Sequence, residues 1–171
     1  MNMPSVERYT AAVITISDSA SNGEREDKSG DTLEGLLQKA GFSITDREVV
    51  PDERQVIAGT LTRCTASHNI ACIFTTGGTG VGPRDVTPEA AKDVIERRMP
   101  GMEEAMRHES LRQTPFAMLS RQVVGVAKDT LIVTLPGSEK AVRECFAVIQ
   151  PVLKHVVDLL AGETAHKSSN N

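Results

Sequence analysis

Hydrophobic residues in this chain gather in short runs, separated by longer stretches with helical periodicity. Residues 10–17 and 70–75 are almost continuous apolar, β-branched runs, which are typical of strands buried on both faces of a sheet. Residues 42–50 alternate for part of their length and predict another strand. Residues 122–127 and 130–135 predict a pair of neighbouring strands.

Helical patterns fill the intervals. Residues 29–40 place Leu33, Leu36 and Leu37 on one stripe, and Gly41 is positioned to end that helix. The polar residues 18–28, between the first strand and this helix, are expected to form a loop.

Further helices are predicted from their start signals. Asp52 is expected to be an N-cap, with Gln55 at the spacing of a capping box. A later helix is expected to begin with Thr87 as its cap and Pro88 at its first position. Another follows Pro100.

The last predicted helix follows Ser138, which is a natural N-cap. Pro151 lies inside this long stretch and is expected to kink or split it, because proline removes a helical hydrogen bond.

Strands that alternate with helices predict an α/β fold, in which a mainly parallel sheet is covered on both faces. The length of 171 residues suits one domain over 1–171, with loose ends at 1–8 and 162–171. No linker or repeat divides the chain.

Ligands of open α/β sheets bind beyond the carboxyl ends of the strands. Four connecting segments are expected to occupy such ends and to converge there. They are residues 17–28, 51–52, 76–87 and 136–138.

Composition narrows the range of functions. The net charge of −4 disfavours nucleic acid as a partner, since a duplex-binding surface is strongly basic. No stretch approaches the roughly 20 apolar residues of a membrane span, and no signal peptide is evident. We therefore expect a cytoplasmic protein with neither nucleic acid nor a membrane as partner.

Cysteine and histidine chemistry is not indicated. Cys64, Cys72 and Cys145 form no paired motif and fit free thiols in a reducing compartment. The four histidines are scattered without the spacing of a metal site.

The glycine-rich segment from Thr76 to Asp85 carries the strongest chemical signal. Glycines let the backbone adopt positive φ and let a ligand approach, and exposed N–H groups beside a helix start favour a phosphate. The segment matches neither a Walker A loop nor a dinucleotide-binding fingerprint. Glycines alone more often indicate a tight connection, but Arg84 and Asp85 beside them favour a site.

Two acidic residues have alternative interpretations. Asp85 is suited either to a magnesium ion that bridges phosphates or to assisting the helix start while pairing with Arg84. Asp52 is suited either to capping its helix or to sharing a divalent cation with Asp85.

Two further segments offer weaker signals. Ser17 and Asp18 could bind a ligand or form only local hydrogen bonds. Ser138 begins a helix that could receive an anion, and an anion there would offset the unfavourable position of Lys140 in the first turn.

Several blocks together resemble the MogA family, which includes the MoaB-type proteins and the G domains of gephyrin. The longest block is TTGGTGVGPRDVTPEA at 75–90. Shorter matches lie at residues 16–19, 29–31, 119–121 and 135–138. The resemblance covers about residues 9 to 160.

The resemblance implies a three-layer α/β/α domain that acts as a molybdopterin adenylyltransferase. Such an enzyme uses ATP and Mg²⁺, transfers AMP to the terminal phosphate of molybdopterin and releases pyrophosphate. Asp52 and Asp85 match the family's catalytic aspartates, which would also bind the metal. The residues expected to bind nucleotide and substrate are Ser17, Asp18, Gly77, Gly78, Thr79, Gly80, Arg84, Thr87, Pro136, Gly137, Ser138 and Lys140.

The resemblance also implies a homotrimer and transient contact with a molybdate-inserting, MoeA-like protein. Two alternatives remain, namely a non-catalytic MoaB-type scaffold that only binds molybdopterin, and a CinA-like nucleotide pyrophosphatase. The complete PRDVTPEA block favours the transferase over both.

Overall fold

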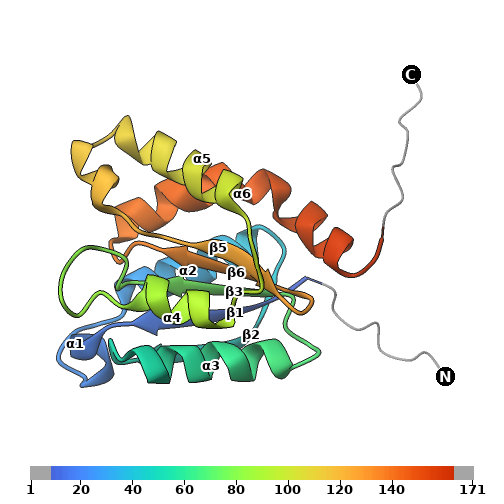
Figure 1. Cartoon of the computed structure of the whole chain (residues 1–171), viewed down its shortest axis with the longest axis horizontal. Coiled ribbons are helices and arrows are strands. Elements are labelled where there is room, and N and C mark those ends of the chain that lie inside the picture. The colour runs from blue at the N-terminus through green and yellow to red at the C-terminus, as the bar shows by residue number, and fades with distance from the viewer. Residues whose placement is uncertain (1–8, 164–171) are drawn as a thin grey trace.

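The computed structural model describes residues 9–163, which form three layers with a six-stranded sheet between two layers of helices (Figure 1). The strands are β1 (Thr10–Ile16), β2 (Ser43–Val50), β3 (Cys72–Thr76), β4 (Arg97–Arg98), β5 (Val124–Ala127) and β6 (Thr130–Leu135). The helices are α1 (Asp18–Ser21), α2 (Lys28–Lys39), α3 (Arg54–Ala66), α4 (Thr87–Val94), α5 (Pro100–Leu111), the 3-10 helix η1 (Pro115–Leu119) and α6 (Glu139–Leu160). The predicted three-layer α/β/α class is confirmed. The segments 1–8 and 164–171 of the expected loose ends lie outside the described residues.

The sheet has the order β2-β1-β3-β6-β5-β4. Strands β2, β1, β3 and β6 are parallel, whereas β5 is antiparallel to β6 and β4 is antiparallel to β5. The chain leaves β1 through α2 to reach β2 on one side, and it returns through α3 to place β3 on the other. Neighbouring strands β1 and β3 therefore continue to different faces of the sheet, which opens a crevice at their carboxyl ends.

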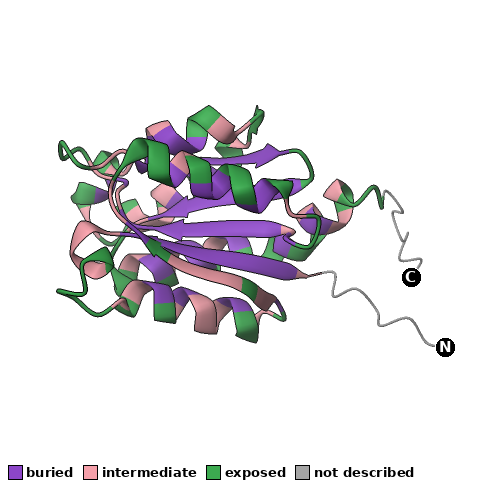
Figure 2. Cartoon of the chain, turned by 90° about the horizontal axis from the view of Figure 1, so that it is seen from below, coloured by how far each residue is buried: buried purple, intermediate pink, exposed green. Residues whose placement is uncertain are grey.

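Each face of the sheet has its own apolar core. Consecutive residues of a strand point to opposite faces, so Phe74 packs with Leu33 of α2 and Phe146 of α6, whereas Ile73 packs with Ile57 of α3. Helix α5 covers the same face as α6, and α4 covers the same face as α3. Strands β1, β3, β5 and β6 are accordingly buried throughout, whereas the edge strands β2 and β4 are more exposed (Figure 2). This rigid sheet positions the loops at its carboxyl edge.

Some helix boundaries follow the sequence signals. Ala40 ends α2, and Gly41 adopts a φ of +85°, the left-handed conformation that favours glycine. Ser138 caps α6, because its hydroxyl accepts a hydrogen bond from the Ala141 N–H at 3.1 Å.

Other expectations were wrong. Residues 18–21 form the short helix α1 and not a loop, because Ser17 caps it by accepting from the Ala20 N–H at 3.2 Å. Helix α6 is not split, since it runs from Glu139 to Leu160 with the exposed Pro151 inside it, and the neighbouring Ile149 and Leu153 are buried.

The two predicted caps at Asp52 and Thr87 are also wrong. Glu53, and not Asp52, is the N-cap of α3, and its side chain makes no cap bond. The Asp52 carboxylate instead accepts a hydrogen bond from the Asp18 N–H. Val86 precedes α4, and Thr87 is its first residue, with its hydroxyl directed to the Gly77 carbonyl. In both cases the polar side chain bonds to the backbone of another loop and does not cap its own helix.

No helix in residues 9–163 is both long enough and apolar enough to cross a membrane.

Candidate active site

Three loops meet backbone to backbone at the carboxyl edge of the sheet. The Gly77 N–H donates to the Leu135 carbonyl at 3.0 Å, and Gly77 has a φ of +104°. A Cβ on Gly77 would lie 2.2 Å from the Ile16 carbonyl oxygen. A Cβ on Gly137 would lie 3.3 Å from the Cα of Gly77. Glycine is therefore required for β1, β3 and β6 to bring their ends this close.

A cavity of about 420 Å³ lies at this meeting point. Its lining comes from the ends of β1, β3 and β6, from the segment between α1 and α2, and from Asp52 after β2. The predicted convergence of the four segments is thus confirmed. Predicted site residues that line the cavity are Ser17, Asp52, Gly77, Gly78, Gly137 and Ser138.

The glycine turn, residues 77–82, leaves the cavity wall and leads towards α4. Within residues 9–163, the N–H groups of Gly78, Thr79, Gly80 and Val81 donate to no acceptor, whereas the next one, of Gly82, donates to Asp85. A run of consecutive N–H groups without acceptors in a turn is suited to binding an anion. The observed turn therefore supports the predicted phosphate affinity.

Asp52 is held beside this turn by a reciprocal pair of hydrogen bonds. The Asp18 N–H donates to Asp52 Oδ2 at 2.8 Å, and the Asp52 N–H donates to Asp18 Oδ1 at 3.0 Å. The other oxygen, Asp52 Oδ1, lies 3.0 Å from the place that a Cβ on Gly78 would occupy. One carboxylate oxygen thus fixes the loop, and the other faces the glycine turn.

Electrostatics distinguishes Asp52 from an ordinary surface acid. Partial burial raises the pKa of Asp52, and the negative charges of Asp18 and Asp85 raise it further. The hydrogen bond from the Asp18 N–H and the charge of Arg84 act in the opposite direction. A cation or a positive ligand group near Asp52 would relieve this repulsion.

The Asp85 side chain lies against the same turn and accepts a hydrogen bond from it. Its Oδ2 accepts from the Gly82 N–H at 2.8 Å and lies 2.9 Å from the Cβ position of Gly80. Asp85 does not line the 420 Å³ cavity, although its charge reaches Asp52. The two aspartates therefore lie at the same edge of the sheet and in different settings.

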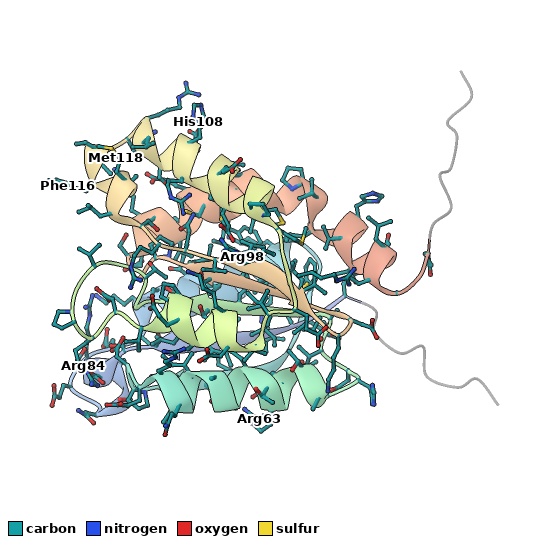
Figure 3. All side chains as sticks on the ribbon, in the orientation of Figure 1. Arg63, Arg84, Arg98, His108, Phe116 and Met118 are labelled. Atoms are coloured by element: carbon teal, nitrogen blue, oxygen red, sulfur yellow. The ribbon has the colours of Figure 1, made fainter. Side chains whose placement is uncertain are left out.

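Arg84 joins the loop before α4 to two other loops and does not pair with Asp85. Its Nε and Nη2 donate to the two Asp18 carboxylate oxygens at 3.0 Å each, and Nη2 also donates to Glu53 at 2.8 Å. These bonds hold the pKa of Asp18 below its usual value. Arg84 lies on the exposed rim, beside α1 (Figure 3), and not in the cavity lining.

The other predicted residues that do not line the cavity are Asp18, Thr79, Gly80, Thr87, Pro136 and Lys140. Thr87 is buried and donates to the Gly77 carbonyl at 2.9 Å, so it supports the turn from behind. Thr79 is also buried. Lys140 is exposed and lies 3.8 Å from Glu144 on its own helix.

Two basic residues near the start of α2 were not predicted as site residues from the sequence. Arg25, between α1 and α2, and Lys28, the first residue of α2, supply the positive charges of the cavity lining. Asp27 anchors this wall, because it caps α2 through the Gly30 N–H at 3.0 Å, accepts from Thr15 at 2.7 Å and pairs with Arg47. The capping signal of an aspartate ahead of a helix was present in the sequence, but the pairing with Arg47 of β2 was not.

Arg121 belongs to the short family match at residues 119–121, but the sequence did not predict its contacts. It binds backbone carbonyls of the glycine turn and of Asp85, and it pairs with Glu89 of α4. No local signal could have identified these contacts, because Arg121 follows the turn by about forty residues.

The oxygen donors of the site suit a magnesium ion that is shared with phosphates. Residues 9–163 contain no group of three or more acidic, histidine or cysteine side chains arranged to hold a metal ion. Mg²⁺ is commonly held by only one or two carboxylates together with substrate phosphates and water. Asp52 Oδ1, beside a turn suited to an anion, fits that kind of site.

The fold and the site define an α/β protein with a cavity, and a turn of N–H groups suited to an anion, at the switch point of its sheet. Residues 12–155 match the probable molybdopterin binding domain family, and the chain belongs to this family.

Curated relatives cover most of the chain. It is 38% identical over 161 residues to the molybdopterin adenylyltransferase of Helicobacter pylori J99, an alignment that covers 93% of this chain and 92% of the relative. It is 41% identical to the molybdenum cofactor synthesis protein cinnamon of Drosophila melanogaster, covering 94% of this chain but only 27% of that longer protein.

Solved structures give the same result. The molybdopterin biosynthesis enzyme MoaB of Thermus thermophilus is 40% identical, with a TM-score of 0.85 over 90% of this chain and 97% of that one. The protein CinA of Thermoplasma acidophilum shares the fold alone, at 16% identity and a TM-score of 0.61 over 86% of this chain and 98% of that one. The predicted family is confirmed.

Proposed function

We propose that this protein is a molybdopterin adenylyltransferase of molybdenum-cofactor biosynthesis, which transfers AMP from ATP to the terminal phosphate of molybdopterin. The protein is an enzyme with a role in that pathway, as its named adenylyltransferase relatives indicate. The observation that supports the specific reaction is the position of Asp52, whose Oδ1 faces a turn of unpaired N–H groups at a cavity.

In this reaction, an oxygen of the terminal phosphate of molybdopterin forms a bond to the α-phosphorus of ATP. The bond from that phosphorus to the α,β-bridging oxygen breaks, and pyrophosphate leaves with the electron pair. Phosphoryl chemistry of this kind is accelerated mainly by positioning and by stabilising charge. The site must therefore hold two anionic reactants close together.

The residues of the chain divide this task by position. The N–H groups of the glycine turn bind phosphate oxygens of the nucleotide. Gly137 and Ser138, on the adjoining wall, contact molybdopterin, and Arg25 and Lys28 attract both anions from the facing wall. The cavity thereby brings the attacking phosphate to the nucleotide.

Asp52 and Asp85 would hold Mg²⁺ together with the nucleotide phosphates. When bound, the ion neutralises charge on the α-phosphate and the leaving pyrophosphate. Asp52 contributes Oδ1, while its Oδ2 stays bonded to the Asp18 N–H and fixes the loop. Asp85 accepts from the Gly82 N–H through its Oδ2 and would contribute Oδ1.

Incubation of the purified protein with ATP, Mg²⁺ and molybdopterin tests the proposal. Adenylylated molybdopterin and pyrophosphate are expected, and the variants Asp52→Asn and Asp85→Asn should keep the fold and lose turnover. AMP formed from nucleotide alone would instead indicate a CinA-like pyrophosphatase. Molybdopterin binding without turnover would indicate a MoaB-type scaffold.

The expected assembly and partner can be tested separately. We expect a homotrimer by light scattering, and transient binding to a MoeA-like protein that receives the adenylylated product.

A further inference from the structure

Arg121 makes three hydrogen bonds to the loop between β3 and α4 and also binds a carboxylate of α4. Its own N–H donates to the Thr79 carbonyl at 2.8 Å. Its guanidinium donates from Nε to the Gly80 carbonyl and from Nη2 to the Asp85 carbonyl, each at 2.7 Å. Glu89 of α4 receives the remaining donors. A single side chain therefore binds the middle of the loop, at Gly80, and its last part, at Asp85.

Binding a carbonyl also fixes the neighbouring N–H, because the peptide group is planar and trans. The carbonyl of residue n and the N–H of residue n+1 point in opposite directions. Arg121 thus sets the directions of the N–H groups of Gly80 and Val81 by holding the carbonyls of Thr79 and Gly80. Both of these N–H groups lack acceptors within residues 9–163.

The guanidinium also removes an obstacle to anion binding. Carbonyl oxygens repel phosphate, and glycine-rich backbone can turn them either way at little cost. Engaged by Arg121, the carbonyls of Gly80 and Asp85 point to a cation and away from a bound anion. Glu89 holds the guanidinium in place, and its pKa is lowered chiefly by Arg121.

We infer that Arg121, held by Glu89, is a positioning residue that preorganises the N–H groups of the glycine turn for the phosphates of the substrate. It acts through the backbone of the turn and does not need to touch the substrate. The inference deepens the proposed function and rests on it for the identity of that substrate.

A second arginine offers a matched control. Arg107 of α5 also donates to backbone carbonyls, those of Ser120 and Gln122, at 3.1 and 3.5 Å. These residues flank Arg121, but Arg107 makes no hydrogen bond to the glycine turn. Arg107→Gln therefore removes a similar set of bonds without freeing the turn.

The test measures inorganic pyrophosphate binding by calorimetry in magnesium buffer, with thermal unfolding to identify folded variants. We expect Arg121→Gln to weaken binding about tenfold, which is the effect of leaving roughly one backbone residue to be ordered on binding. Arg121→Lys should be intermediate, because it keeps the charge but loses the planar fork. Arg107→Gln should bind within about twofold of the parent, though both glutamine variants lose some thermal stability.

Kinetics then separates the two proposals. In the transfer assay Arg121→Gln should raise the KM for ATP and lower kcat, whereas a purely structural role would change only the unfolding temperature. Unchanged pyrophosphate affinity in folded Arg121→Gln, or an equal loss in Arg107→Gln, would overturn the positioning role. A parent protein that binds pyrophosphate, responds as expected to Arg121→Gln and yet forms no adenylylated product would overturn only the proposed reaction.

Discussion

The floor and the rim of the cavity are built on different physical principles. At the floor, Gly77 and Gly137 bring main chains into contact, and there is no space for a side chain. At the rim, Asp18, Arg84 and Glu53 are exposed side chains that form a charged bridge between loops. Steric fit therefore determines the backbone arrangement at the floor, and solvent-screened charges determine how the loops at the rim are held together. Substitutions should therefore affect stability at the floor and pH response at the rim.

The largest effect is expected for Gly77→Ala. The added Cβ would meet the Ile16 carbonyl at 2.2 Å, and alanine is strained at a φ of +104°. We expect a loss of unfolding free energy of about 3 kcal/mol or more, measured by urea denaturation. Gly59→Ala in α3 is the control, because nothing lies within 4 Å of its Cβ position. It should be neutral or stabilise by up to about 1 kcal/mol. Equal stability of the two variants would contradict the steric account of the floor.

Asp52→Asn is expected to separate turnover from stability. Loss of the charge should lower kcat for adenylyl transfer by about 10²-fold or more. Because the folded-state pKa of Asp52 is raised, its ionisation disfavours folding at neutral pH, and stability increases as pH falls through that pKa. The asparagine variant should accordingly unfold at the same or a higher denaturant concentration. A marked loss of stability would show that Asp52 is mainly a structural residue.

Arg84→Gln should change the pH dependence more than the stability. The Arg84 charge lowers the pKa of Asp52 and of Asp18, so its removal raises both. The acidic limb of the kcat–pH profile should move to higher pH, while the thermal unfolding profile at neutral pH changes little. An unchanged limb would mean that neither Asp52 nor Asp18 governs activity at low pH.

The smallest effect is expected for Arg54→Gln. Arg54 forms a comparable two-pronged pair with Asp93, at 2.7 Å for each bond, but this pair joins α3 to α4 away from the cavity. Neither the pH profile nor the KM for ATP should change. A shift as large as that of Arg84→Gln would show that the rim responds to any surface charge and not to the bridge at Asp18.

The glycine turn of the site was predictable because its parts are consecutive in the chain. The buried run 70–75, the glycines after it and the PRD block place a flexible turn at a strand end by local pattern alone. What the pattern could not predict is which partner each polar group would take. Asp52 had a capping partner available in its own helix, yet it bonds to the Asp18 N–H of another loop. Lys140 was expected to bind substrate but lies outside the cavity, because its place on α6 points it to Glu144.

By itself, the sequence determined the α/β alternation, the family and the convergence of loops at one edge, because periodicity and strand ends are local properties of the chain. Only the tertiary structure decided that Asp85 bonds back to its own loop, that Arg84 bridges to Asp18, and that Arg121 holds the glycine turn. The physical reason is that distance and direction decide which of several competing donors and acceptors a polar group bonds to. These distances and directions are fixed only when strands far apart in sequence pack into one sheet.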